Sequence, residues 1–411
     1  MAVVLTDLLY FCIVMEIDAK HKLFIKEHLQ DDVNKLLLSS KRFSDINMEL
    51  VVDQIISRRQ IREKLPSWYG NYDLYFPAKI TVEQCSSEQT ARYKQRLFSA
   101  GSTVCDLTGG LGIDAFFISQ VVGQIFYVER YKTYCDVARH NFDVLRAWNI
   151  SVKNGDSSKL LDTLPKIDAF YIDPARRGCG NKRVYALEDC EPNLPKLLPE
   201  LFRKADIVVA KLSPMADLQA TLRLLLSTKE IHVLSVRNEC KELLFVLDRT
   251  HPNGLDPLVK CVNYTSEGKE ESFEFLLSEE TGLLGVETTN VLSAYLYEPN
   301  VSILKAGAFK MVSVRFGMKK LHVNSHLYTS DDFVDDFPGR RFKVETVYPF
   351  SNRLCRSLSS SLPKVNITVR NFPLSVKELR DKMKISEGGD LYLFATTLAD
   401  GAKVLVLCSR T

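Results

Sequence analysis

The chain has 411 residues, of which 45% are hydrophobic and 26% are charged, and this is enough for two or three globular domains with sizeable cores. No stretch reaches the roughly 18 unbroken apolar residues of a membrane span. The ten cysteines show neither a CxxC motif nor a Cys/His metal spacing. We therefore expect a soluble, cytoplasmic protein with reduced thiols that uses no metal and no membrane.

The net charge of +3 is unevenly distributed along the chain. Residues 301–411 contain 18 basic and 10 acidic side chains, a local net charge of +8, so the other 300 residues carry −5. This asymmetry favours a polyanionic partner for the C-terminal part. An ordinary solvated basic surface is the alternative.

The apolar opening of the chain does not have the pattern of an export signal. It lacks a basic front and a small-residue cleavage site, and it contains Asp7. An ordinary polar stretch begins at Met15. We interpret residues 1–14 as an upstream-start extension, with a short N-terminal strand or helix as the alternative.

Helical spacing of apolar residues between Leu23 and Ile56 predicts a helical N-terminal segment, which we assign to residues 1–80. Another predicted helix follows before the first strand, with Ser86 or Ser87 as its N-cap.

From Thr103 onward, short β-rich runs alternate with helical stretches. Repeated units of this kind predict an α/β fold with a parallel sheet wound on both faces, over residues 81–249. The runs at 231–238 and 242–248 lie so close together that they must pair as an antiparallel hairpin. We therefore expect a Rossmann-like, doubly wound sheet of five parallel strands that ends in an antiparallel hairpin.

Two further strands near 258–264 and 272–278 and one helix over 303–316 predict a connector of ferredoxin-like or α+β character, residues 250–321.

The remaining residues, 322–411, contain three strand patterns and one helix. The helix opens at Ser375 with Glu378 three residues later, which is a capping box, and Asp400-Gly401 closes the last hairpin. This predicts a small α+β domain.

A glycine-rich loop, DLTGGLG, follows the first predicted strand and opens a helix. Gly110 and Gly112 let the backbone approach a ligand, and the helix N–H groups point at that ligand. Glu129 ends the second strand 19 residues after Gly110, where an acid would bind ribose hydroxyls. The loop, from Asp106 through Thr108 to Gly112, therefore predicts a nucleotide-like ligand.

The acids around this loop favour S-adenosyl-L-methionine over NAD. Asp106 lies at the tip of the first strand, where it would attract the methionine ammonium and repel a pyrophosphate. Asp156 follows the third strand and could accept a hydrogen bond from the adenine amine. Helix N-capping is the alternative for both aspartates, and a plain surface acid is the alternative for Glu129.

The fourth strand ends in FYIDPARRG, and the carboxyl ends of strands in such a sheet form the ligand crevice. Pro174 biases Asp173 to an extended backbone, so that the carboxylate can accept hydrogen bonds from an amine and aim its nitrogen at a methyl group. The following loop has the composition of a phosphate grip, with Arg176, Arg177, Lys182 and Arg183. Pairing of the arginines with Glu188, Asp189 or Glu191 is the alternative.

With these motifs in place, the whole chain resembles the bacterial class I methyltransferases that carry a C-terminal THUMP-like domain. The recognisable blocks are TVEQCSSEQTARYK, VCDLTGGLGIDAF, YIDPARRG, YLYEPNVSILKAG and NSHLYTSDDFVDDFPGRRF. The catalytic half is similar to ribosomal RNA guanine-N2 methyltransferases. Because THUMP domains generally bind RNA, the resemblance implies an RNA substrate, rRNA or tRNA, for residues 322–411 to hold.

The sequence departs from these patterns at two places. Thr108 stands where many methyltransferases have the first glycine. DPAR replaces Asp/Asn-Pro-Pro-aromatic, so position 176 has no aromatic ring to stack on a target base. Either another residue such as Tyr185 stacks on the base, or the substrate differs. DPARRG is also similar to a motif of uridine-C5 enzymes, but those need a cysteine after the fifth strand, where this chain has Lys211-Leu212-Ser213-Pro214.

We therefore predict an S-adenosyl-L-methionine-dependent methyltransferase that acts on a base amine of RNA. The alternatives are methylation of a protein or a small molecule, and a non-catalytic RNA-binding module that retains the fold.

Overall fold

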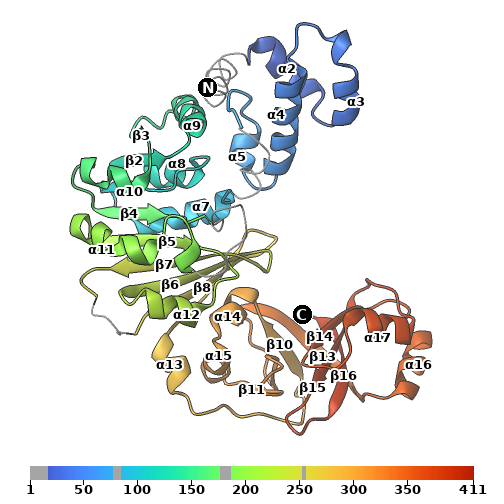
Figure 1. The fold of residues 1–411 in the computed structure, drawn as a ribbon. Helices are drawn as coiled ribbons and strands as arrows, with labels where there is room; N and C mark the ends of the chain where they lie inside the picture. Colours follow the sequence, from blue (N-terminus) through green and yellow to red (C-terminus); the bar gives the residue numbers. More distant parts are fainter. Residues whose placement is uncertain (1–16, 77–84, 176–186, 252–255) are drawn as a thin grey trace. The chain divides into compact units, whose positions relative to one another are not determined.

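The computed structural model describes residues 17–76, 85–175, 187–251 and 256–411 (Figure 1). The chain forms two compact units. The first comprises residues 1–229 and 244–255, and the second comprises residues 230–243 and 256–411. None of the described helices is long and apolar enough to cross a membrane.

The first unit opens with helices, as predicted: α2 (Ala19–Glu27), α3 (Val33–Leu38), α4 (Met48–Ile61) and α5 (Pro66–Tyr69). Asp18, Asp32 and Asn47 cap the first three of these helices with their side chains, which satisfies backbone N–H groups that have no partner inside the helix. The helix α7 (Glu88–Lys94) follows, and its N-cap is Ser87, one of the two predicted candidates.

The predicted parallel strands and their helices are confirmed in the first unit. The strands are β1 (Thr103–Asp106), β2 (Gln124–Glu129), β3 (Ile150–Asn154), β4 (Ala169–Ile172) and β5 (Ile207–Leu212). The helices between and after them are α8 (Ile113–Ser119), α9 (Lys132–Val144), α10 (Ser157–Leu160), α11 (Leu194–Lys204) and α12 (Leu218–Leu224). Neighbouring strands in the order β3-β2-β1-β4-β5 pair in parallel.

The predicted hairpin is formed by β6 (Thr228–Val236) and β7 (Glu239–Asp248), which are neighbours in the sheet. The two residues of its turn, Arg237 and Asn238, have φ of 52° and 60°, the conformation of a tight hairpin turn. The full strand order is β3-β2-β1-β4-β5-β7-β6-β8-β9. This is the doubly wound sheet with a terminal hairpin that the sequence predicts, extended by two strands.

The two added strands are β8 (Leu258–Tyr264) and β9 (Glu270–Leu276). The sequence predicts them as part of a connector, but β8 pairs in parallel with β6, and β9 pairs antiparallel with β8. Sequence spacing shows a strand but not the edge to which it is added, because pairing depends on tertiary contacts.

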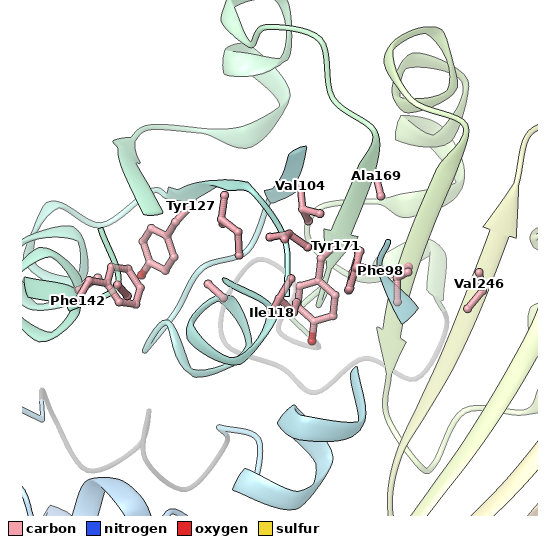
Figure 2. Packing of buried hydrophobic residues seen from close by; sticks show 14 residues of the cluster. Phe98, Val104, Ile118, Tyr127, Phe142, Ala169, Tyr171 and Val246 are labelled. Carbon is pink, nitrogen blue, oxygen red and sulfur yellow. The ribbon is translucent and has the colours of Figure 1, made fainter. Parts of the chain in front are cut away.

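The core beneath the glycine-rich loop is shown in Figure 2. Tyr127 of β2 meets Phe142 of α9 edge-on, with ring centroids 5.6 Å apart, and both side chains are buried. Tyr171 of β4 and Ile118 of α8 belong to the same cluster. These side chains fix the first, second and fourth strands against α8 and α9, and so they position the loops at the strand ends.

The second unit contains another mixed sheet, with the order β11-β12-β10-β13-β16-β15-β14. Its strands are β10 (Tyr295–Pro299), β11 (Lys319–Lys320), β12 (Tyr328–Ser330), β13 (Gly339–Pro349), β14 (Asn366–Arg370), β15 (Leu391–Thr397) and β16 (Lys403–Arg410). Its helices are α13 (Leu277–Gly282), α14 (Val301–Ala306), α15 (Phe309–Phe316), α16 (Asn352–Ser361) and α17 (Val376–Met383).

The capping box at Ser375 and Glu378 is present at the start of α17, and the three predicted C-terminal strands are β14, β15 and β16. The single helix expected over 303–316 is instead two helices. Gly307 has a φ of 78° and ends α14, because a left-handed residue stops an α-helix.

Candidate functional site

The site is built around Asp106, the last residue of β1. Its side chain is only 2% exposed, and its Oδ1 accepts a hydrogen bond from the Thr108 backbone N–H at 2.9 Å. Burial raises the pKa of this carboxyl to about 8, and the neighbouring acids Asp114, Asp173 and Glu129 add to the increase. Among the described residues no ion pair neutralises Asp106, so the site favours a cation beside it.

The glycine-rich loop fits closely against the Tyr127 ring. The Tyr127 hydroxyl donates a hydrogen bond to the Gly110 carbonyl at 2.5 Å, and a Cβ on Gly109 would overlap the ring. Gly112 has a φ of 75° and is the N-cap of α8. The loop therefore packs tightly between β2 and the start of α8. Its contact with a nucleotide-like ligand stays a prediction.

Glu129, at the end of β2, is 8% exposed. Its carboxylate connects the glycine-rich loop to the turn that follows β2. Its Oε2 accepts from the Gly110 N–H at 3.0 Å, and its Oε1 accepts from the Tyr131 N–H at 2.8 Å. Burial raises the pKa of Glu129, although these two N–H groups act in the opposite direction. The structure thus brings Glu129 and the loop together. The contact with ribose hydroxyls, which the 19-residue spacing predicts, stays a prediction.

Asp156 is exposed and caps α10. Its Oδ1 accepts from the Ser158 N–H at 3.0 Å and from the Ser158 hydroxyl at 2.7 Å, and these bonds from Ser158 lower the pKa of the carboxyl. The N-capping alternative is therefore realised in the geometry. The adenine contact of Asp156 stays a prediction.

Asp173 follows β4 and is connected to the glycine-rich loop through Thr108. The Asp173 backbone N–H donates to the Thr108 hydroxyl oxygen at 2.7 Å, while the same hydroxyl donates to Asp106 Oδ1 at 3.4 Å. The Asp173 side chain is 38% exposed, and Pro174 is buried. The first and fourth strands therefore present two carboxylates on either side of one threonine.

Sequence reasoning missed a charged network behind Asp173. Lys211 of β5 places its Nζ 2.6 Å from Asp173 Oδ2 and 3.6 Å from Asp114 Oδ2. Lys94 of α7 lies 3.1 Å from Asp114 Oδ1. The signal that could have found it is a lysine inside an otherwise apolar strand, because lysine is almost never buried without a partner.

The predicted phosphate grip, Arg176, Arg177, Lys182 and Arg183, lies outside the described residues, as does Tyr185. On the far side of that segment, Glu191 pairs with Ala175 through both backbone groups, and its carboxylate lies 3.1 Å from Arg130. One acid considered as a partner for the arginines is therefore bound to Arg130 at the end of β2.

The residues at the strand ends fit the S-adenosyl-L-methionine that the sequence predicts. Asp106 is a buried acid whose ionisation a neighbouring ammonium would favour, Glu129 could accept from hydroxyls, and the glycines of the loop that packs on Tyr127 would allow a close backbone approach. Among the described residues no group of His, Cys, Asp and Glu side chains could hold a metal ion.

A sheet of this strand order, with a glycine-rich loop after β1 and acids at the ends of β1, β2 and β4, defines a class I methyltransferase. The family models match the C-terminal part as a ferredoxin-like domain over residues 295–338 and a THUMP-like domain over residues 339–410.

A solved structure from Porphyromonas gingivalis W83, described as a "putative methyltransferase", is 38% identical and has a TM-score of 0.86, covering 95% of this chain and 98% of its own. The chain belongs to the same family, the methyltransferases with a C-terminal THUMP-like domain. It is also 28% identical, over 130 residues, to a protein-L-isoaspartate O-methyltransferase of Brucella anthropi. That match covers 32% of this chain and 52% of the relative, so the chain spans about half the length of this enzyme.

Proposed function

We propose that this methyltransferase uses S-adenosyl-L-methionine and transfers its methyl group to a base amine of RNA. The observation that carries the proposal is the pair of carboxylates joined through Thr108. Asp106 is buried and suits the cofactor ammonium, whereas Asp173 is partly exposed on the neighbouring strand and suits an amine N–H. The two acids thus have separate environments for two ligands.

When bound, the cofactor supplies a methyl group on a positively charged sulfur. Asp106, Glu129 and the Gly110–Gly112 backbone would hold it. Asp173 accepts a hydrogen bond from the amine and orients the lone pair of its nitrogen, with its own backbone fixed by Thr108 and restricted by Pro174. Orientation of this kind can supply much of the barrier reduction in a direct displacement.

The RNA part of the proposal is supported by the THUMP-like match and by the net charge of +8 over residues 301–411. Arg176, Arg177, Lys182 and Arg183 would contact phosphates beside the amine site. A reducing cytoplasm suits the described cysteines, which are present as thiols. Transfer to a protein or to a small molecule is the second candidate, since the curated relative carries the name of a protein methyltransferase.

The cofactor is tested by thermal unfolding. S-adenosylhomocysteine should raise the melting temperature and NAD should not, because a ligand that binds only the folded state stabilises it by mass action. Asp106→Ala and Glu129→Ala should abolish the shift. Equal stabilisation by NAD would contradict the assignment.

The acceptor site is tested with Asp173→Ala. This variant should bind S-adenosylhomocysteine almost normally, while methyl transfer from labelled cofactor to total RNA falls at least about a hundredfold, the loss expected when one preorganised hydrogen-bonding group is removed. Asp143→Ala, which removes an exposed carboxylate of α9 outside the predicted site, is the control for loss of negative charge. Near wild-type transfer by Asp173→Ala would show that FYIDPARRG is only a structural strand end.

A further inference from the structure

Lys211 is a largely buried cation at the centre of the charged network. Its side chain is 11% exposed, and its Nζ lies 2.6 Å from Asp173 Oδ2, 3.6 Å from Asp114 Oδ2 and 3.1 Å from the Ser86 hydroxyl. A charge removed from water in this way needs anionic partners and hydrogen bonds. Lys211 therefore has a defined position relative to the Asp173 carboxylate.

Asp114 of α8 is the second acid beside Lys211, and it also pairs with Lys94. It accepts hydrogen bonds from the Tyr171 hydroxyl at 2.7 Å and from the Ser86 hydroxyl at 2.8 Å, and Lys94 lies 3.1 Å from its other oxygen. Burial opposes ionisation of Asp114, but Lys94 and Lys211 outweigh burial and lower its pKa to about 2. Asp114 is therefore a permanent anion that supports Lys211 at physiological pH.

We propose that Lys211 is a positioning residue for methyl transfer, which holds Asp173 by one carboxylate oxygen and neutralises it, so that the acceptor site selects an uncharged N–H donor. The inference rests on the proposed function of Asp173. It deepens that function by naming the chemical class of the acceptor, a neutral exocyclic amine of a base.

The charges of the network support this selectivity. Lys94 and Lys211 are balanced by Asp114 and Asp173, so the four side chains have no net charge. An ammonium brought to Asp173 would meet the charge of Lys211 on the same carboxylate, and like charges at such a site are mutually unfavourable. A base amine carries no charge and can donate to the second oxygen of Asp173.

A double-mutant cycle tests the inference in the full-length protein, with Lys211→Met, Asp173→Asn and the double variant. Lys211→Met should lower kcat at least about tenfold, with little change in the KM for cofactor or in the melting shift with S-adenosylhomocysteine. Because Lys211 acts through Asp173, the double variant should be no slower than Asp173→Asn alone.

The conservative variant adds a readout that a merely structural role would not move. Lys211→Arg retains a positive charge beside Asp173 and should keep most of the rate that Lys211→Met loses. The Arg variant also tests the inference if Lys211→Met does not fold.

The outcomes separate the two proposals. The wild-type protein is assayed first, before any variant is compared. If it methylates a lysine-rich protein, or leaves RNA unmethylated, the RNA function is overturned and the neutral-amine inference fails with it. Additive rate losses in the cycle, or a rate for Lys211→Arg as low as that of Lys211→Met, would overturn the role of Lys211 alone.

Discussion

At the residue scale, the Asp106 carboxyl has a pKa far above the ordinary value of an aspartate. Its pKa is raised from 3.8 to about 8 by burial, with further increases from the neighbouring acids. Between these two pH values the folded protein holds a proton that the unfolded chain has released. Unfolding therefore becomes easier as the pH rises from about 4 to 8, because the unfolded state binds fewer protons.

The neutral variant Asp106→Asn should remove this dependence in the ligand-free protein. Its free energy of unfolding, relative to that of the wild type, should increase steadily from pH 5 to pH 8 and level off above pH 8. Urea unfolding at unit intervals of pH measures the difference, and the other titrating groups cancel because both proteins contain them.

Asp156→Asn is the matched control. The pKa of Asp156 is lowered in the fold, chiefly by the Ser158 hydroxyl, so its contribution to stability is present above pH 5 and is lost only as the pH falls through the lowered pKa. Its difference from the wild type should be flat over the same range. A flat difference for Asp106→Asn would contradict the raised pKa.

Thr108 shows why one departure from the glycine pattern matters. Its hydroxyl accepts from the Asp173 N–H and its own N–H donates to Asp106, which a glycine could do only in part because it has no hydroxyl. Thr108 therefore connects Asp106 to Asp173. The sequence predicts Thr108 as a cofactor-binding residue but does not predict this connection.

At the scale of an element, the start of α8 depends on a single glycine. Gly112 has a φ of 75°, and a Cβ at this position would lie 2.5 Å from Cζ of Phe142. Alanine would therefore meet two costs, about 1–2 kcal/mol for the left-handed backbone and about 1–3 kcal/mol for the overlap.

Gly112→Ala should lower the free energy of unfolding by the sum of these costs and should weaken S-adenosylhomocysteine binding, because the helix N–H groups are displaced. Gly101→Ala is the control, since Gly101 has a φ of 73° and nothing lies within 4 Å of its added Cβ. Urea unfolding of both variants separates the cost of the left-handed backbone, which both share, from the cost of the overlap with Phe142, which only Gly112→Ala has. Equal losses in the two variants would show that Phe142 gives way.

At the scale of the whole molecule, the C-terminal unit combines the THUMP-like match with the basic part of the chain. Exposed cations lie on its helices, among them Arg353 on α16 and Lys377 and Lys382 on α17. If RNA is held there, affinity should fall with salt, because each phosphate contact releases counterions.

Replacing these three side chains by glutamine should weaken RNA binding and reduce the slope of log affinity against log salt by up to about 0.9 for each cation that contacts a phosphate. The control changes Lys26, Lys35 and Lys41, which are exposed in the first unit, to glutamine and so alters the net charge equally. Binding titrations at several salt concentrations distinguish the two. Equal effects would indicate a response to total charge and not to a C-terminal surface.

The sequence by itself determined the local elements and their order. Alternation of strand and helix patterns predicted β1 to β5, and the closeness of two strand patterns predicted the hairpin of β6 and β7. The spacing of Ser375 and Glu378 predicted the capping box. These features depend on residues close together in the chain. The 19-residue spacing from Gly110 likewise predicted Glu129 at the end of the second strand, but not its hydrogen bond with the Gly110 N–H. Local pattern also predicted one helix over 303–316, and the backbone of Gly307 divides it.

Only the tertiary structure decided which distant side chains meet. The charged network joins four parts of the chain, and its first and last residues lie more than a hundred positions apart. Its members are Lys94, Asp114, Asp173 and Lys211. No periodicity of the sequence relates these positions. Their ionisation depends on burial and on neighbouring charges that exist only in the folded chain. For the same reason, the addition of β8 and β9 to the first sheet was not predictable, since the choice of a strand partner is made by packing across the sheet and not by the strand's own sequence.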